Sequence, residues 1–213
     1  MSSLRNIGTL GALALAATGA FATPIYNASG FTAADKTINF TEVSVTNNSA
    51  VTNQFLAYGV QFGKAGGASP WKMTTSTTVT GTGFSGKFIT STGATNNNST
   101  NYLSIQFTND VDAAGAYFEF NNEDPLIKIS AFNNNNFVES LNYTNNNCCA
   151  TSAFLGFNNI VFDELRISNL KDRIVYLDTL KFSGVNAVPE PASMALAGLV
   201  MGGLFTTRKR WIR

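Results

Sequence analysis

Residues 102–120 read YLSIQFTNDVDAAGAYFEF and contain the clearest strand pattern of the chain. Near both ends of this stretch every second residue is apolar: Leu103, Ile105 and Phe107, then Ala116, Phe118 and Phe120. Successive side chains of a β-strand point to opposite faces of a sheet, so this alternation predicts strands with one buried face. We therefore predict one strand at residues 102–107 and a second at 115–120, with a polar connection between them.

The same signal recurs along the chain. Short runs rich in Val, Ile, Phe, Tyr and Thr alternate with clusters of Asn and Gly, and no stretch between Thr23 and Val188 has helical periodicity. Further strands are predicted at residues 37–45, 58–62, 73–80, 87–90, 127–132, 137–143, 153–157, 160–168 and 174–182, the last with an irregularity near Asp178. The predicted core positions within them are Ile127, Ile129, Ala131, Val175, Leu177 and Leu180.

Closely spaced short strands without helices predict an all-β fold, an antiparallel β-sandwich over residues 23–186. The length of 213 residues suits one such domain with appended ends. Asparagine runs at 96–98, 133–136 and 145–147 predict turns, because asparagine tolerates left-handed backbone. An up-and-down barrel and a short β-solenoid are the alternatives, and the absence of a fixed-period repeat argues against the solenoid.

Composition excludes several kinds of function. The chain has no histidine, which excludes Ser-His-Asp and Cys-His nucleophilic systems, imidazole acid–base catalysis and metal sites built on imidazole. The formal net charge is +1 and only 13% of residues are charged, so no electrostatic case for nucleic-acid binding exists. Between Thr23 and Val188, nine Lys and Arg oppose twelve Asp and Glu, a net charge of −3.

The first 22 residues predict a signal peptide, a short apolar helix that signal peptidase removes. One positive charge, at Arg5, precedes the small and apolar run Ile7–Gly19, and Ala20-Phe21-Ala22 has the small-x-small pattern of a cleavage site. An amphipathic N-terminal helix is the alternative, but the run has no polar face. We predict cleavage after Ala22 and export of the mature chain.

Residues 187–213 have three parts in a fixed order. The segment Val188-Pro189-Glu190-Pro191 comes first, an apolar run from Ala192 to Phe205 follows, and Arg208-Lys209-Arg210 and Arg213 close the chain. The apolar run reaches about 21 Å as a helix, short of the roughly 30 Å hydrocarbon core, so it predicts a short transmembrane helix. The basic cluster favours the cytoplasmic side, which leaves the domain outside the inner membrane.

This tail resembles the PEP-CTERM sorting signal of Gram-negative bacteria. The resemblance implies that an exosortase, a membrane cysteine transpeptidase, cuts at the motif, with Glu190 as the charged recognition element. It further implies a transient membrane anchor and then a place at the cell surface or in the extracellular matrix, in association with exopolysaccharide or biofilm. A plain C-terminal membrane anchor is the alternative.

A second resemblance covers parts of the predicted domain. The segments 38–42, 51–55, 59–62, 154–157 and 177–182 are similar to galactose-binding-like or carbohydrate-binding jelly rolls, in which the first and last strands pair. This resemblance implies a structural Ca²⁺ held by Glu42 and Asp178, since Ca²⁺ prefers oxygen ligands. Two exposed carboxylates are the alternative, and Asp110 and Asp112 form a weaker candidate pair without the rest of an EF-hand loop.

Aromatic residues are candidates for contact with a glycan. Trp71 follows Pro70 and a Gly-Gly loop, so we expect it to stand exposed near Tyr102 or Tyr143, with Tyr58 as a further neighbour. A core position is the alternative, because tryptophan buries a large apolar area. The 17 phenylalanines exceed Trp and Tyr together, which fits core filling better than a carbohydrate platform.

The adjacent pair Cys148-Cys149 contains the only thiols, and export favours their oxidation. A strained vicinal disulfide, intermolecular bridges and two reduced thiols are all open.

Glycoside hydrolysis needs two convergent carboxylates, and Glu119, Glu123, Asp163 and Glu164 are in no pattern that supports it. We expect Glu119 to face solvent, opposite Phe118 and Phe120. The sequence therefore predicts a protein that is not an enzyme. We expect a structural, adhesive or glycan-binding module, with a polysaccharide hydrolase or a self-associating surface-layer protein as the alternatives.

Overall fold

The computed structural model describes residues 23–32, 35–75, 81–84, 86–92, 100–120, 124–145, 152–168 and 174–184. The predicted signal peptide, the predicted sorting tail and both cysteines lie outside these residues. The strands are β1 (Thr23–Ile25), β2 (Lys36–Ile38), β3 (Val60–Ala65), β4 (Lys72–Thr75), β5 (Lys87–Thr92), β6 (Tyr102–Phe120), β7 (Asp124–Asn133), β8 (Asn136–Asn145), β9 (Ala153–Ser168) and β10 (Ile174–Gly184). Two short 3-10 turns, η1 (Ala28–Gly30) and η2 (Leu56–Tyr58), complete the described elements, and neither is a helix that could cross a membrane.

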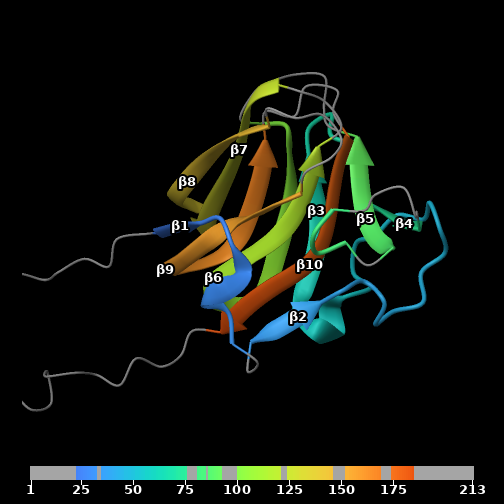
Figure 1. The fold of residues 1–213 in the computed structure, drawn as a ribbon, viewed down its shortest axis with the longest axis horizontal. Coiled ribbons are helices and arrows are strands. Elements are labelled where there is room, and N and C mark those ends of the chain that lie inside the picture. The colour runs from blue at the N-terminus through green and yellow to red at the C-terminus, as the bar shows by residue number, and fades with distance from the viewer. Residues whose placement is uncertain are drawn as a thin grey trace, which may run out of the picture.

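The strands form one antiparallel sheet in the order β4-β5-β10-β6-β9-β7-β8, with β1 on β9, β2 on β10 and β3 on β6 (Figure 1). The long strands β6 and β9 pair with each other and with different partners at their two ends. The first part of β6 pairs with β3, and the later part pairs with β10. The sheet thereby folds over on itself into the predicted antiparallel β-sandwich.

A register shift in the middle of β6 allows this fold-over. Pairing between β6 and β9 is regular up to Gln106 and from Ala113 onward, with irregular steps around Val111. Bulges of this kind bend a strand and increase its twist, so one strand can serve both layers. The two strands predicted at 102–107 and 115–120 are therefore one strand, and those predicted at 153–157 and 160–168 are likewise one.

The core lies between the two layers. All of the predicted core positions are buried, from Leu103 on β6 to Leu180 on β10. Large rings fill the space between them, among them Phe40, Phe55, Phe62, Trp71 and Phe162. Several of these rings meet edge to face, as Phe40 and Phe55 do with centroids 5.3 Å apart, an arrangement that aromatic quadrupoles favour.

Two of the predicted strands have different bounds in the structure, because the backbone turns within the predicted range. The strand predicted at 37–45 ends at Ile38, because Phe40 has a φ of 60° and turns the chain away from the sheet. The strand predicted at 58–62 begins at Val60, because Gly59 ends η2 in the left-handed conformation with a φ of 95°. The irregularity predicted near Asp178 is confirmed by a register shift between Asp178 and Lys181, where Thr179 has a φ of 47°.

The asparagine run 133–136 is the turn between β7 and β8. Asn133 pairs with Asn136, and the two residues between them, Asn134 and Asn135, have φ values of 48° and 64°. Two-residue hairpin turns with positive φ at both positions match the twist of the flanking strands, and asparagine is favoured there. This turn places Asn135 beside β9, where it enters the site described next.

Candidate functional site

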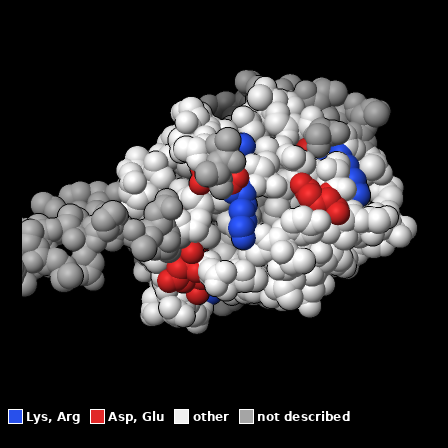
Figure 2. All heavy atoms as spheres, turned by 90° about the horizontal axis from the view of Figure 1, so that it is seen from below, with Lys and Arg blue, Asp and Glu red and all other residues white. Residues whose placement is uncertain are grey.

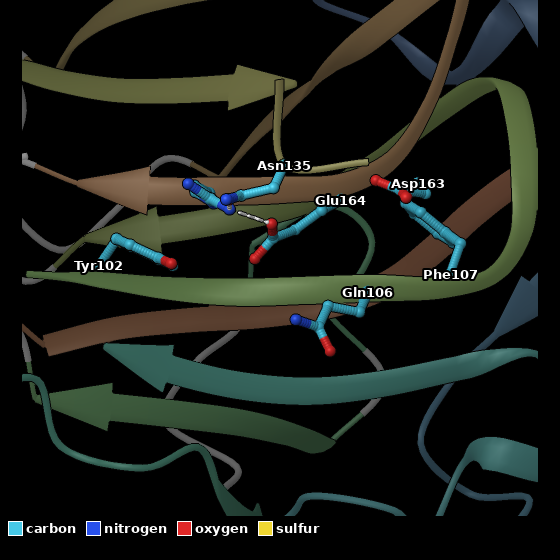
Figure 3. Close-up of a pocket in the computed structure, with 7 residues that line it drawn as sticks. Tyr102, Gln106, Phe107, Asn135, Asp163 and Glu164 are labelled. Atoms are coloured by element: carbon cyan, nitrogen blue, oxygen red, sulfur yellow. Dashed lines mark hydrogen bonds and ion pairs between the residues drawn. The ribbon is translucent and has the colours of Figure 1, made fainter. Parts of the chain in front are cut away.

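A polar pocket of about 460 Å³ opens on the outer side of β6 and β9 (Figure 3). Its walls come from two strands and one turn: Tyr102, Gln106 and Phe107 of β6, Asp163, Glu164 and Arg166 of β9, and Asn135. In Figure 3, Tyr102 lies at one end of the pocket and Asp163 with Phe107 at the other, with Glu164 between them. We call this site the Arg166 pocket.

Strand register brings these side chains together. Gln106 is paired with Glu164, and the next outward rung pairs Ser104 with Arg166. On the other side of β9, Glu164 is paired with Phe132 and Arg166 with Ser130 of β7. Because residues i and i+2 of a strand share a face, the alternation that buries Leu165 and Ile167 directs Glu164 and Arg166 outward.

The guanidinium of Arg166 is held at its edge by polar groups. Its Nη2 lies 2.6 Å from Glu164 Oε2, and its Nε donates to the same oxygen over 2.8 Å. Nη2 also donates to the side-chain oxygen of Asn135. The side chains of Arg166 and Glu164 are only 15% and 8% exposed, so this ion pair is shielded from water far more than a typical surface pair.

Two aromatic rings lie close to the guanidinium. The Cζ atom of Arg166 lies 3.8 Å from the ring centroid of Phe132 and 4.6 Å from that of Tyr102. Phe132 in turn meets the edge of Phe137, with centroids 5.9 Å apart, and Phe137 is 57% exposed. Side chains from β8, β7, β9 and β6 thus form a row of contacts across the sheet, which we call the aromatic stack.

The hairpin turn also anchors the far end of the pocket. The backbone N–H of Asn134 donates to Asp163 Oδ2 over 3.0 Å, and the Asn133 side chain donates to the carbonyl of Val161 over 3.3 Å. These bonds tie the β7–β8 turn to β9. The pocket is therefore preorganised by its own hydrogen bonds.

Charge on the molecular surface is sparse. On the face shown in Figure 2, acidic and basic side chains stand in small separate groups within a largely uncharged surface. The Arg166 pocket itself has one basic and two acidic side chains in its lining. The arrangement suits a ligand with many hydroxyl groups, because amide, carboxylate and phenol groups can each accept or donate hydrogen bonds.

The residues predicted to contact a glycan do not lie together in the structure. Tyr102 lines the pocket. Trp71 does not stand exposed as expected: it is 1% exposed, its ring meets Phe62, and its Nε1 donates to the carbonyl of Ser104 over 3.2 Å. Burial of its large apolar surface outweighs any gain from exposure, so the exposed position is wrong for Trp71 and the core alternative is confirmed.

Tyr143 is not among the residues that line the pocket. Its ring packs 6.1 Å from that of Phe120 at the edge of the core, and burial raises the pKa of its hydroxyl. Tyr58 is 39% exposed and its hydroxyl donates to the carbonyl of Glu42, so it stands on another part of the surface.

Glu119 is buried, contrary to the expectation that it faces solvent. Its rung partner is Tyr176 on β10, and burial raises the pKa of Glu119. The outer side of this part of the sheet is covered by residues 81–84, where Phe84 packs on Phe88 and Gly83 touches the ring of Tyr117. A covered face was not predictable from alternation, which assumes that the second face meets water.

Glu42 and Asp178 lie near the join of β2 and β10. Glu42 Oε1 accepts from the backbone N–H of Asn39 over 2.7 Å, and Asp178 Oδ1 accepts from that of Thr179 over 2.6 Å. The Thr179 hydroxyl links the two parts, since it lies 3.4 Å from Asn39 Oδ1 and donates to the carbonyl of Gly83 over 2.7 Å. Asp178 is fully buried, so it is not the exposed carboxylate of the alternative interpretation.

The oxygen atoms around Glu42 are of the kind that Ca²⁺ prefers. Glu42 Oε2 is buried without a hydrogen-bond partner, and the Asn39 side-chain oxygen and the Gly83 carbonyl are neutral oxygens that both lie within 3.4 Å of the Thr179 hydroxyl. Across the described ranges, no three of the residue types His, Cys, Asp and Glu gather closely enough to form a metal site of their own. A cation here would therefore rely on amide and carbonyl oxygens beside the two carboxylates.

The remaining residues predicted as site residues either lie outside the described part of the chain or are not gathered into a site. Cys148, Cys149, Glu123 and the sorting residues from Val188 to Arg210 lie outside the described residues. Asp110 is exposed on β6, and Asp112 accepts a hydrogen bond from the Ser183 hydroxyl. Arg166, Gln106 and Asn135 were not predicted as site residues. The available signal was a charged pair, Glu164 and Arg166, on the polar face of an otherwise apolar strand.

Residues 187–210 match the family model of the PEP-CTERM protein-sorting motif, which confirms the sorting motif predicted at the C-terminus. No curated protein matches this chain. Among solved structures, the K2 cleaved adhesin domain of Lys-gingipain is 13% identical over 70% of this chain and 99% of its own, with a TM-score of 0.46. A variant of CBM29-2, a family 29 carbohydrate-binding module, is 12% identical over 70% of this chain and 94% of its own, with a TM-score of 0.38.

The catalytic domain of Agl-KA is 11% identical over 72% of this chain and 31% of its own, with a TM-score of 0.29. All three structures have low sequence identity to this chain, and their TM-scores are below 0.5. The sorting motif implies an exported protein that exosortase processes at the membrane. This chain thus joins an all-β antiparallel sandwich to a C-terminal PEP-CTERM protein-sorting motif.

Proposed function

We propose that this protein is a non-catalytic cell-surface or matrix protein that binds extracellular polysaccharide through the Arg166 pocket. The observation that carries the proposal is that Arg166, in contact with the rings of Tyr102 and Phe132, shares one pocket with amide and carboxylate groups. Sugars present hydroxyl groups around a compact ring, so a site with planar side chains and fixed hydrogen-bonding groups is suited to them.

Free hydrogen-bonding capacity remains in the pocket. Nε and Nη2 of Arg166 are engaged by Glu164 and Asn135, and no described residue accepts from Nη1. Gln106 is exposed at the pocket wall and has no described side-chain partner. The Nη1 donors and the Gln106 amide are therefore the groups that we expect to meet the sugar.

The hydrogen-bond partners of the two pocket carboxylates, Asp163 and Glu164, favour sugar binding over hydrolysis. Glu164 is paired with Arg166, and Asp163 accepts from the Asn134 backbone. A glycosidase needs one carboxyl group that donates a proton and a second that acts as a nucleophile or base. Two neighbouring carboxylates with fixed hydrogen-bond partners serve orientation better than proton transfer.

The position of the sorting motif supports display of this domain outside the membrane. β10 ends at Gly184, and the match to the motif begins at residue 187. The tail therefore follows the folded domain almost directly. We propose removal of residues 1–22 by signal peptidase and release of the domain by exosortase to the cell surface or matrix. Intact mass of the protein from cells and medium, with and without exosortase, tests this step; a retained tail ending at Arg213 would contradict it.

Glycan binding is tested by affinity measurements with the exopolysaccharide of the producing cells. Gln106→Ala removes an exposed pocket amide, and we expect binding to weaken about fivefold, the effect of one hydrogen bond. Gln61→Ala is the matched control, because Gln61 is the rung partner of Gln106 on β3 and lies outside the pocket lining. Equal binding by the wild type and both variants, or no binding at all, would overturn the proposal.

We also propose that a structural Ca²⁺ joins Glu42 to the β10 bulge at Asp178. The support is the buried Glu42 Oε2 without a partner, which water or a cation would satisfy. The proposed role is to stabilise the join of β2 and β10, away from the Arg166 pocket.

A further inference from the structure

The charge of the Arg166 pocket determines which sugars it can hold. Its one basic group is already neutralised, because both Nε and Nη2 of Arg166 contact Glu164 at 2.8 and 2.6 Å. Asp163 adds a second carboxylate to the lining. The pocket therefore carries a net negative charge in a partly buried setting, where charge interactions are stronger than in bulk water.

Recognition of an acidic sugar would need a free arginine fork. Arginine binds carboxylate or sulfate groups through two parallel N–H donors on one edge. In this pocket that edge faces Glu164, and Nη2 also donates to Asn135. The rings of Phe132 and Tyr102 lie close to the guanidinium, with centroids 3.8 and 4.6 Å from its Cζ atom. Only the two N–H groups of Nη1 remain, and they point in different directions, so they do not form the parallel pair of donors that a carboxylate or sulfate group accepts.

Among the described residues, no basic side chain besides Arg166 lines the pocket to balance the negative charge of Asp163 and Glu164. The lining residues include no lysine. Lys128, on the neighbouring β7, has its Nζ 5.8 Å from the ring centroid of Phe137, at the outer end of the aromatic stack. The predicted domain as a whole carries a net charge of −3 between Thr23 and Val188, which adds long-range repulsion of polyanions.

The same carboxylates are good partners for uncharged sugars. A hydroxyl group that donates to an ionised carboxylate forms a short, charge-assisted hydrogen bond. One oxygen of Asp163 is used by the Asn134 backbone and one oxygen of Glu164 by Arg166, so each carboxylate has a second oxygen that can accept from a sugar hydroxyl.

We infer that the Arg166 pocket selects uncharged polysaccharide chains and rejects chains that carry carboxylate or sulfate groups. This inference rests on the proposed glycan-binding function and names its substrate class. The uncharged chain donates its hydroxyl groups to Asp163 and Glu164, and an acidic chain is repelled by the same two residues.

The test uses matched polymers that differ only in charge. Galactomannan, dextran and the carboxyl-reduced exopolysaccharide of the producing cells are each compared with their carboxymethylated forms, with the full-length protein in mild detergent. We expect each neutral polymer that binds to lose at least about tenfold in affinity on carboxymethylation at low salt. The loss should shrink at high salt, because salt screens charge repulsion.

A charge-removing variant locates the effect. Asp163→Asn keeps an oxygen that can accept from Asn134, and we expect it to recover threefold or more of the affinity for the carboxymethylated polymers. Asp110→Asn is the matched control, because Asp110 is an exposed aspartate of β6 outside the pocket lining, and it should have no such effect.

The outcomes separate the two proposals. Equal or tighter binding of the carboxymethylated polymers, or equal recovery by both variants, would overturn the charge selection and leave glycan binding in place. Binding that is unchanged in Gln106→Ala would instead overturn the pocket as the glycan site. No binding to any polymer would overturn glycan binding and, with it, the inference that depends on it.

Discussion

Arg166 and Glu164, two residues apart on one face of β9, form an ion pair with 2.6 Å between Nη2 and Oε2. Both side chains are largely buried, at 15% and 8% exposure. A pair in this setting differs from an exposed one, because removal of one partner leaves the other charge without water or a counter-ion. Loss of one partner of this pair is therefore costly to the fold, and the pair also shapes the pocket.

Replacement of Arg166 by methionine should destabilise the domain by about 3 kcal/mol, since it strands the Glu164 carboxylate and removes the stack on Phe132 and Tyr102. The double variant Arg166→Met with Glu164→Gln should recover part of this loss, because no buried charge is left. Urea unfolding measures both effects. A cost below about 0.5 kcal/mol for the single variant would mean that the pair behaves as an exposed one.

Trp71→Phe should cost about 1–2 kcal/mol, because it removes the hydrogen bond from Nε1 to Ser104 and leaves a small void. Affinity for polysaccharide should not change, since Trp71 is buried away from the ligand. Chemical denaturation and a binding assay on the same protein separate the two effects. Tyr102→Ala is the comparison, and it should weaken binding. A variant of Trp71 that folds normally but loses binding would contradict the burial described for this side chain.

Chelation of calcium should lower the stability of the wild type by roughly 2–3 kcal/mol if free Ca²⁺ was about 100 times its dissociation constant. In calcium, Glu42→Gln should be less stable than the wild type, and chelator should not change its stability. The reason is that the substitution removes the carboxylate that we propose as a ligand of the cation. Calorimetry with calcium or with chelator gives both values. Asp35→Asn is the control, because Asp35 is not among the residues that we propose to hold the cation. Equal chelator sensitivity in the wild type and Glu42→Gln would rule out a site at Glu42.

Glu119→Gln should increase stability at neutral pH relative to the wild type. Burial raises the pKa of Glu119, so the folded state binds the proton more tightly than the unfolded state does. The wild type therefore loses stability as the pH rises through the folded-state pKa, and glutamine removes that loss. Thermal unfolding from about pH 4 to pH 7 should show the two proteins diverge as pH rises.

The same substitution has a second readout in Tyr176. Burial raises the pKa of Tyr176, and the charge of Glu119 raises it further. The pKa of Tyr176 should fall in Glu119→Gln, which tyrosine-resolved NMR titration would detect. An unchanged Tyr176 pKa together with an unchanged pH dependence would show that Glu119 is not charged beside Tyr176.

The two central asparagines of the β7–β8 turn offer a matched pair of variants. Both have positive φ, so glycine suits either position without backbone strain. Asn135→Gly removes the acceptor for Arg166 and should weaken polysaccharide binding about threefold to tenfold, while Asn134→Gly should leave binding near the wild-type value. Equal binding by the two variants would show that Asn135 does not position Arg166.

Most of the sheet was predictable because alternation is a local property. Leu103, Ile105 and Phe107 are buried as predicted, and the asparagine run at 133–136 forms the predicted turn. Strand ends were less predictable. The chain leaves the sheet at Phe40, whose positive φ is rare for an aromatic residue and has no sequence signature.

The candidate site was predictable only in part. Tyr102 was selected for its ring, and it lines the pocket. Trp71 was selected for the same reason, and it is buried against Phe62. Tyr102 and Trp71 are both large aromatic residues. They differ in which face of the sheet they occupy and in what covers that face.

The sequence by itself determined the apolar alternation, the turn chemistry and the sorting motif at residues 187–210, because each depends on residues close together in the chain. Only the tertiary structure decided the Arg166 pocket. Gln106 and Glu164 meet through the register of β6 with β9, and Asn135 reaches Arg166 from a third segment. Register between distant strands is set by packing of the whole core, which no local pattern encodes.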